Sequence, residues 1–425
     1  MQRIFENIKP LLLLLLLNFL GVALIFLNGI QSGDMVILCG IMCLISLATY
    51  IIITLCKLGD SYLFVIISML CSIGIIMQTR IHPANGIRQM ILYLGGVVCF
   101  FAALFLYRAL GKRLKKYTLI YWGVSLFLFV LTMVMGVVTK GAKNWIRIGS
   151  LSVQPAEFIR ILFVLSMSAI FTNARLPEKT LKKLKVDIAE QKKQRQARLI
   201  IAGMIAFTNA MCLFLQREWG IALLFFAIYI AYLYIYGDDR LFFCANILLV
   251  AFAAFIGVNY LSHIQVRIDA WRDPFANPYT GGYQILQSLF AISAGGFSGR
   301  GIGTGTPGAI PIVSSDFIFS AICEEMGVIG GIAVIMLYFL LVYRGFKIAL
   351  SSTNEFNKAV ASGLSVTLGI QTFIIVGGVI KLIPLTGITL PFISYGGSSM
   401  ISTFIIMGML QAISGAKGEV TDEIE

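Results

Sequence analysis

Charged residues are scarce in this sequence, and histidine is almost absent. Only 12% of the 425 residues are charged, whereas 58% are hydrophobic and the mean hydropathy is +0.90. A soluble domain carries about twice that charged fraction, so the composition indicates a polytopic membrane protein. With only two histidines, His82 and His263, a histidine-based metal centre or catalytic triad is not expected.

Cysteine spacings typical of disulfide frameworks or zinc sites are also missing. All eight cysteines lie inside or at the edges of apolar runs, and none are spaced as CxxC. A disulfide framework or a zinc site is therefore not expected. The basic runs lack interleaved aromatic residues, so the net charge of +13 does not indicate a nucleic-acid partner. We attribute that charge to membrane topology and to attraction by membrane lipids.

Long apolar runs are what the sequence has in abundance. Their spacing predicts an all-α polytopic fold with about twelve transmembrane helices, because lipid leaves the backbone no other way to satisfy its hydrogen bonds. No small-residue cleavage site follows the leucine run of Met1–Leu17, so we expect a retained first helix rather than a signal peptide. The predicted spans are 11–30, 35–56, 61–79, 89–107, 117–138, 155–173, 198–215, 220–236, 241–262, 316–343, 358–383 and 393–413.

The distribution of lysine and arginine predicts the orientation. An even number of spans puts both termini on one side, together with the basic segments 108–116, 175–198 and 344–358. Since cytoplasmic loops are enriched in these residues, that side is predicted to be the cytoplasm. The tail, residues 414–425, is then cytoplasmic, and the loop between the ninth and tenth spans faces outward.

That outward loop, residues 262–315, is much longer than a connector needs, and long loops on rigid scaffolds often carry function. We expect it to be ordered and partly folded over the bundle, with short helical pieces. The reason is its aromatic residues, which have little reason to lie in water: Trp271, Phe275, Tyr279, Tyr283 and Phe297.

An acidic residue and a basic residue lie within the sixth predicted span. Glu157 and Arg160 are three residues apart and hence share a helix face, where they can neutralise each other. Charges at membrane depth normally face the bundle interior or a wet cavity. A purely structural ion pair and a functional pair are both consistent with this pattern.

Five motifs, in order along the chain, resemble the SEDS family, the FtsW/RodA/SpoVE group of bacterial peptidoglycan glycosyltransferases. They are Gly141-Ala-Lys-Asn-Trp-Ile-Arg-Ile-Gly149 with Gln154-Pro-Ala-Glu157, Gln216-Arg-Glu-Trp-Gly220, Gly282-Tyr-Gln284 with the glycine run after it, Ser315-Asp-Phe-Ile-Phe319 with Glu324-Glu-Met-Gly327, and Thr389-Leu-Pro-Phe-Ile-Ser-Tyr-Gly-Gly-Ser-Ser399. The resemblance implies a ten-helix core over residues 58–413. Residues 1–57 are then an N-terminal addition of two helices.

The family polymerises lipid II, an undecaprenyl-pyrophosphate-linked disaccharide, at the outer face of the membrane. Such a reaction needs a base for the acceptor hydroxyl and positive charge or donors for the leaving pyrophosphate. The family's loop aspartate corresponds to Asn277, and an amide cannot act as a carboxylate base. The catalytic candidates are therefore Asp273, four residues earlier, and Asn277 itself. If this segment is helical, the two share a face.

The resemblance supplies the other candidate residues. The substrate-binding candidates are Lys143, Trp145, Arg147, Glu157, Arg160, Arg217, Arg267, Gln284, Arg300, Asp316, Ser398 and Ser399. The last two belong to a small-residue helix entry that could present backbone amides to an anion.

Two other functions are consistent with the motifs: a flippase for a lipid-linked precursor, and a non-catalytic scaffold for a transpeptidase. The few charges within the spans disfavour the flippase, which should have polar groups along a path. The resemblance implies lipid II and a class B penicillin-binding protein transpeptidase as partners. No cofactor is assigned, and a divalent cation is a candidate that the sequence neither requires nor excludes.

Overall fold

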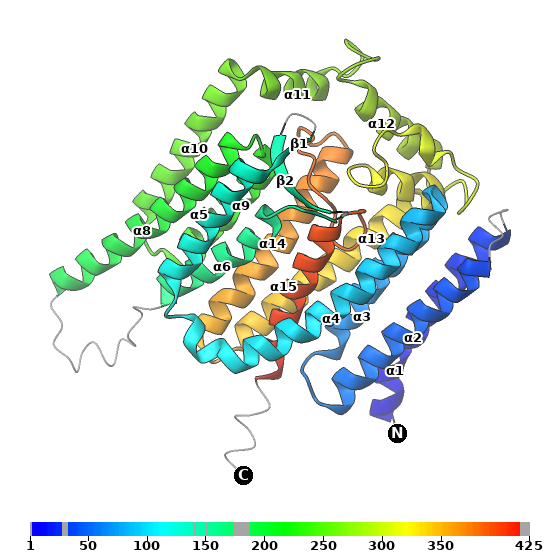
Figure 1. Ribbon diagram of the computed structural model, residues 1–425, viewed down its shortest axis with the longest axis horizontal. Coiled ribbons are helices and arrows are strands. Elements are labelled where there is room, and N and C mark those ends of the chain that lie inside the picture. Colours follow the sequence, from blue (N-terminus) through cyan, green and yellow to red (C-terminus); the bar gives the residue numbers. More distant parts are fainter. Residues whose placement is uncertain (1, 28–32, 140–141, 150, 173–187, 417–425) are drawn as a thin grey trace. The chain divides into compact units, whose positions relative to one another are not determined.

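The computed structural model describes residues 2–27, 33–139, 142–149, 151–172 and 188–416, and these are mostly helical (Figure 1). Twelve helices coincide with the predicted spans: α1 (Gln2–Leu27), α2 (Gly33–Leu55), α3 (Ser61–Ile81), α4 (Pro83–Leu114), α5 (Thr118–Met135), α6 (Ala156–Thr172), α8 (Ile188–Leu215), α9 (Trp219–Tyr236), α10 (Arg240–Tyr260), α13 (Ile318–Ser351), α14 (Glu355–Val379) and α15 (Gly397–Gly415).

Within the described ranges, ten of these helices are long and apolar enough to cross a membrane, all except α1 and α6. The chain is therefore a multi-pass membrane protein, as the hydropathy predicts. Their exposed faces carry large apolar side chains such as Leu241 and Phe252, which is what lipid-facing surfaces require. Part of the basic segment 175–198 and nearly all of the tail 414–425 lie outside the described residues.

The chain forms two compact units. The first consists of Met1–Phe105, Val258–Arg344 and Gln371–Glu425. In it, α1 and α2 pack against each other and against α3 (Figure 1). The side chain of Tyr93 in α4 fixes this group, because its hydroxyl is hydrogen-bonded to Ser46 of α2 (3.2 Å) and Ser68 of α3 (3.1 Å).

The same unit contains a polar clamp at the link between α2 and α3. Asp60 accepts two hydrogen bonds from Arg344 of α13, at 2.8 and 2.6 Å, and its backbone N–H donates to Ser414 of α15. The Arg344 guanidinium also lies 4.4 Å from the ring centre of Tyr62. This clamp joins the N-terminal helix pair to the ends of two helices far away in sequence.

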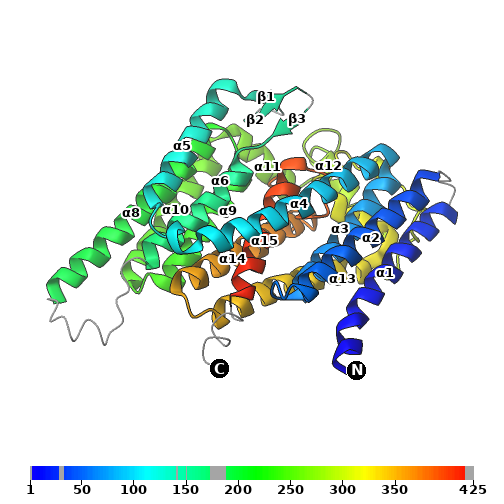
Figure 2. The ribbon, with the colours of Figure 1, turned by 60° about the horizontal axis from the view of Figure 1, so that its bottom comes forward.

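The second unit consists of Leu106–Gly257 and Gly345–Ile370. Here α5 packs on α6 and α8, and α9 packs on α6 and α8. Between the end of α5 and the start of α6 lies a three-stranded antiparallel sheet that the sequence pattern does not predict (Figure 2). Its strands are β1 (Val137–Thr139), β2 (Ala142–Ile148) and β3 (Leu151–Val153). Two of its strands have only three residues, which is too few to show an alternating pattern.

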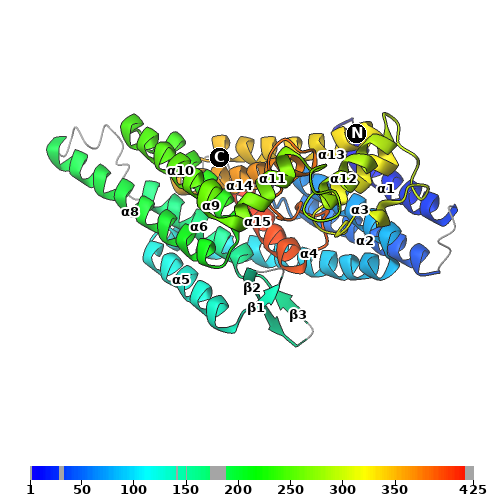
Figure 3. The same ribbon diagram turned by 90° about the horizontal axis from the view of Figure 1, so that it is seen from above.

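The long loop contains three short helical pieces, α11 (Ser262–Arg272), α12 (Tyr283–Gly295) and the 3-10 turn η1 (Pro307–Ala309). Figure 3 shows α12 beside the start of α13, where the hydroxyls of Ser288 and Ser320 are 2.6 Å apart. The expected short helices are confirmed. Of the loop's aromatic residues, Phe275, Tyr279 and Phe297 are 65%, 91% and 75% exposed, so the rest of the chain does not cover them.

Candidate functional site

A buried carboxyl organises the polar end of the second unit. Glu218 precedes α9, and its Oε1 accepts hydrogen bonds from the amides of Asn144 in β2 and Gln154 before α6, the latter at 2.5 Å. Its other oxygen, Oε2, is buried and has no hydrogen-bond partner among the described residues. We call Glu218, Asn144 and Gln154 the Glu218 junction, because they connect three separate segments of the chain.

The environment of Glu218 favours its protonated form. Burial raises the pKa of this carboxyl to about 7 from its usual value of 4.5. The hydrogen bonds from Asn144 and Gln154 lower it, while the negative charge of Glu157 raises it further. Desolvation outweighs the two donors because a buried charged oxygen without partners is expensive.

Glu157 and Arg160 form the predicted ion pair on the first turns of α6. Arg160 Nη2 lies 2.9 Å from Glu157 Oε2, and both side chains are almost fully buried. Gln154 and Pro155 turn the chain into this helix, where the backbone N–H of Glu157 donates to the carbonyl of Gln154. The pair faces the interior of the unit rather than lipid, which is how intramembrane charges are tolerated.

The predicted cations of this unit lie around the sheet and the α8–α9 turn. Lys143 and Trp145 in β2 are half-buried, and Lys143 Nζ donates to the Val134 carbonyl (3.5 Å). Arg147 in β2 and Arg217 in the turn are exposed. Arg217 has a φ of +61°, so the turn is tight and holds a non-glycine residue in the left-handed region.

In the first unit, α11 is docked onto the segment that follows α14. Arg267 Nη1 donates to the carbonyls of Leu385 (3.1 Å) and Thr386 (3.0 Å), and Trp271 Nε1 donates to the carbonyl of Lys381 (3.0 Å). Burial lowers the pKa of Arg267, and the nearby charge of Asp316 opposes that shift. The loop's first helix is thus fixed by side-chain donors to backbone carbonyls.

The two catalytic candidates both lie at the surface of the loop. Asp273 ends α11, and its Oδ1 accepts a hydrogen bond from the backbone N–H of Phe275 (3.0 Å). Asn277 lies in the turns that follow, where its carbonyl accepts from Thr280 and Gly282. The helix stops at Arg272, so the condition under which Asp273 and Asn277 would share a helical face is not met. Pro274 explains this, because proline disfavours helix at the residue before it.

The glycine-rich run folds around two buried glutamates at the start of α13. Glu325 pairs with Arg80 Nε at 3.0 Å, and Arg80 Nη2 donates to the carbonyls of Gly303 (3.0 Å) and Gly305 (2.9 Å). Glu324 accepts from the backbone N–H of Thr306 at 2.8 Å. These contacts fix the loop backbone against α3 and α13.

The predicted cation Arg300 belongs to the same run. Its side chain is 46% exposed, and Nη1 lies 3.6 Å from Glu324 Oε1. Gly327 interrupts α13 with a φ of +70°, and a Cβ built there would lie 2.4 Å from the Gly299 nitrogen. Only glycine permits so close a contact between these two backbones.

The remaining candidates of the first unit differ in accessibility. Asp316 is half-buried and accepts from the Ser315 hydroxyl at 2.8 Å, and Gln284 in α12 is half-buried as well. Ser398 and Ser399 are buried in the first turn of α15, and the Thr389 hydroxyl donates to that of Ser399 at 2.7 Å. The small-residue entry is therefore cross-linked to the chain that precedes it.

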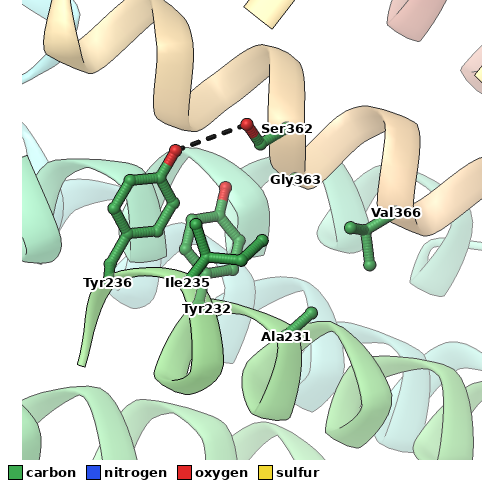
Figure 4. A pocket seen from close by; sticks show the side chains of 7 residues that line it. All are labelled: Ala231, Tyr232, Ile235, Tyr236, Ser362, Gly363 and Val366. Atoms are coloured by element: carbon green, nitrogen blue, oxygen red, sulfur yellow. Dashed lines mark hydrogen bonds between the residues drawn. The ribbon is translucent and has the colours of Figure 1, made fainter. Parts of the chain in front are cut away.

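A small pocket lies between α9 and the first part of α14 in the second unit (Figure 4). Tyr236 donates to Ser362 (3.3 Å), and Tyr232 donates to the Ala359 carbonyl (2.9 Å). The pocket carries no charged residue and does not suit a pyrophosphate. Its lining residues are Ala231, Tyr232, Ile235, Tyr236, Ser362, Gly363 and Val366.

Glu218, Asn144 and Gln154 are not predicted as a group by the sequence, although all three lie within the motifs described above. A signal was present, since Glu218 is an isolated acidic residue in the turn between two predicted apolar spans. Among the described residues, no three His, Cys, Asp or Glu side chains are grouped so as to hold a metal ion.

Comparisons with known proteins agree with this architecture. RodA of Mycobacterium tuberculosis H37Rv, named a peptidoglycan glycosyltransferase, is 34% identical over 369 residues, covering 84% of this chain and 78% of its own. FtsW of Bacillus subtilis, named a probable peptidoglycan glycosyltransferase, is 31% identical over 383 residues, with 84% and 91% covered.

Two solved structures share the fold. A chain from a peptidoglycan synthase complex that coordinates polymerization and crosslinking matches with a TM-score of 0.67 at 23% identity, covering 84% of this chain and 97% of that chain. RodA of Thermus thermophilus matches with a TM-score of 0.58 at 22% identity, covering 84% and 96%. The family model of FtsW, RodA and SpoVE, described as "cell cycle protein", matches residues 48–418, and the chain belongs to this family.

Proposed function

We propose that this protein is a peptidoglycan glycosyltransferase that polymerises lipid II into glycan strands. The observation that carries the proposal is the family match over residues 48–418, together with relatives of that name at 34% identity. The retained polar motifs lie at sheet, turn and loop positions rather than in lipid-facing helix surfaces, which suits a reaction on a substrate with a polar head group.

The reaction joins two sugars by a direct displacement. The acceptor hydroxyl oxygen forms a bond to the anomeric carbon of the donor sugar, and the bond from that carbon to the pyrophosphate oxygen breaks. The hydroxyl proton goes to a base, and the pyrophosphate leaves with the electron pair. Inversion at the sugar carbon needs no covalent intermediate with the protein.

We assign the base to Asp273. It is exposed, and the Phe275 N–H fixes one carboxylate oxygen, so the other can be presented in a defined direction. A base must come within about 2.6–3.2 Å of the proton donor in the substrate complex, directly or through one water. A turn-capping role alone would use the same hydrogen bond, so mutation must separate the two roles.

The leaving pyrophosphate requires positive charge. The guanidinium groups of Arg147 and Arg217 in the second unit and of Arg267 and Arg300 in the first are the candidates, together with the ammonium group of Lys143 on β2. Arg267 is already rigid through its two carbonyl contacts, and rigid donors stabilise developing charge without reorganisation. The buried Glu157–Arg160 pair supports the substrate-binding face of the second unit.

The proposed orientation puts both termini in the cytoplasm and the loop 262–315 outside, where lipid II presents its sugars. The proposed partner is a class B penicillin-binding protein transpeptidase, which would crosslink the new strands. A related chain comes from a complex that couples polymerization to crosslinking.

Purified protein incubated with lipid II, with products resolved by gel electrophoresis, tests the proposal. Glycan ladders that disappear when Arg267 or Asp273 is replaced support the glycosyltransferase. Movement of labelled lipid II across a vesicle bilayer without polymer formation would support a flippase instead. If this protein makes no polymer under any condition but stimulates its transpeptidase partner, the result would support the scaffold function.

A further inference from the structure

Glu218 is a buried, proton-binding group for which the transfer reaction described above has no use. It lies where the chain enters α9, and its Oε1 receives the amide donors of Asn144 and Gln154. Asn144 belongs to the sheet that carries Lys143 and Arg147, and Gln154 belongs to the turn that starts α6. One carboxyl oxygen therefore determines how the sheet and the Glu157–Arg160 helix are placed next to each other.

The second oxygen, Oε2, determines which protonation state of Glu218 is stable in the junction. Oε2 is buried without a hydrogen-bond partner among the described residues, and the whole residue is only 6% exposed. A neutral carboxylic acid can remain there at modest cost, whereas an ionised one leaves an unsolvated, unpartnered charge. Ionisation therefore favours arrangements in which this oxygen reaches water.

The surroundings supply little charge to compensate. From α6, Glu157 faces Glu218 and repels its ionised form, and the positive charge of Arg160 is already paired with Glu157. On β2, Lys143 points to the Val134 carbonyl, on the opposite side of the strand from Asn144. Arg217 is exposed, and the described helices α5 and α9 contain no acidic or basic residue.

We propose that Glu218 is a positioning residue that acts in its protonated form, holding the β1–β3 sheet against the start of α6 and so fixing Lys143 and Arg147, on the opposite face of β2, where they bind the substrate. Loss of the proton opens this junction and weakens substrate binding. The inference rests on the proposed glycosyltransferase function for its kinetic consequence, but the opening itself is independent of that function.

The first experiment measures lipid II polymerisation by the full-length protein from pH 6 to pH 8. We expect wild-type kcat/KM to fall about tenfold over this range, mainly through a rise in KM, with a midpoint near the pKa of about 7 given by burial of Glu218. Glu218→Gln, which keeps an oxygen acceptor and cannot ionise, should retain its pH 6 activity within about twofold and lose this fall.

Two further variants complete the set. Glu355→Gln removes a half-exposed carboxylate at the start of α14 and should behave as wild type at every pH. Glu218→Ala removes the acceptor for both amides and should raise KM at every pH. A Glu218→Gln profile with the same fall as wild type would overturn the proposal, as would a Glu218→Ala protein with unchanged KM.

Hydrogen exchange gives a readout without substrate. After correction for intrinsic rates, residues 142–153 of the wild-type protein should exchange at least several-fold faster at pH 8 than at pH 6, and those of Glu218→Gln should not. Equal protection at both pH values in wild type overturns the positioning role. If protection changes as expected but no polymer forms, the proposed function fails and the junction proposal stands.

Discussion

At the scale of single residues, the buried ion pair of α6 shows how a charge is tolerated inside this protein. Glu157 and Arg160 neutralise each other at 2.9 Å, and neither is accessible to water. Removal of one partner leaves a buried, unpaired charge, which is worse than the loss of the pair.

We therefore expect Glu157→Gln to lower the free energy of unfolding by about 3–5 kcal/mol. Replacement of both residues, as in Glu157→Leu with Arg160→Met, should lower it less, because no buried charge remains. Thermal unfolding in detergent measures both. A double variant less stable than the single one would show that the pair is held by something other than charge neutralisation.

The second prediction at this scale concerns the proposed catalytic base, Asp273. We expect Asp273→Asn to reduce polymerisation at least about a hundredfold, which is typical for loss of a general base. The turn should survive, because the asparagine side-chain oxygen can still accept from Phe275.

Asn277→Asp is the companion variant, since it restores an acid at the family's usual position. Activity that survives Asp273→Asn and rises sharply with Asn277→Asp would mean that Asp273 only caps the turn. Both proteins should be compared with wild type in one lipid II assay, with their unfolding temperatures as the control for folding.

The raised pKa of Glu218 also predicts how stability depends on pH. Between its unfolded value near 4.5 and its folded value of about 7, the folded state binds the proton more strongly, so stability falls as pH rises across this window. The loss is on the order of 3 kcal/mol. Glu218→Gln should flatten this part of the curve, and an unchanged curve would contradict the pKa of about 7.

At the scale of elements, the glycine-rich run and the interruption of α13 depend on each other. Gly327 has a φ of +70°, and a Cβ added to it would lie only 2.4 Å from backbone atoms of the run. Gly327→Ala should therefore destabilise the protein by more than about 1 kcal/mol.

Gly308 provides the matched control for that substitution. A Cβ there would meet no atom within 4 Å, and its φ is not in the positive range. Gly308→Ala should stay within about 0.5 kcal/mol of wild type in the same unfolding measurement. Similar losses for the two variants would show that the loop, rather than the close backbone contact, is sensitive to added bulk.

Helices of this protein were predictable from sequence because lipid forces each apolar run of sufficient length into the same structure. The sheet was not, since it forms through pairing between the short strands β1, β2 and β3, with a bulge between Val137 and Val138. The Glu218 junction was missed for a related reason. Its three members lie in separate motifs, and only the folded chain brings their side chains to one oxygen.

The end of α11 illustrates the same limit. The positions of Asp273 and Asn277 allowed a helical turn, but Pro274 and the capping hydrogen bond to Phe275 stop the helix first. The exposed loop aromatics Phe275 and Tyr279 likewise show that composition does not determine which surface of a loop is covered.

At the scale of the whole molecule, topology is the property that remains to be measured. Cys56, exposed between α2 and α3, is predicted to lie in the cytoplasm. A membrane-impermeant maleimide should modify it only after the membrane is permeabilised.

Tyr279 is predicted to lie outside and is 91% exposed. With the exposed cysteines Cys56 and Cys244 replaced by serine, Tyr279→Cys should react in intact cells. The opposite pattern of labelling would reverse the orientation and remove lipid II at the outer face as the substrate of this loop.

Arg80 orders the glycine-rich run with a cation that belongs to the protein itself. Two backbone carbonyls and a carboxylate converge on its guanidinium, a set of oxygen ligands of the kind that extracellular loops often offer to Ca²⁺. Here the cation is covalently part of α3 and cannot dissociate. The order of this loop should therefore be insensitive to chelators and to the calcium content of the medium. A loop ordered by bound Ca²⁺ would lose its structure in ion-poor environments, whereas this loop would keep it.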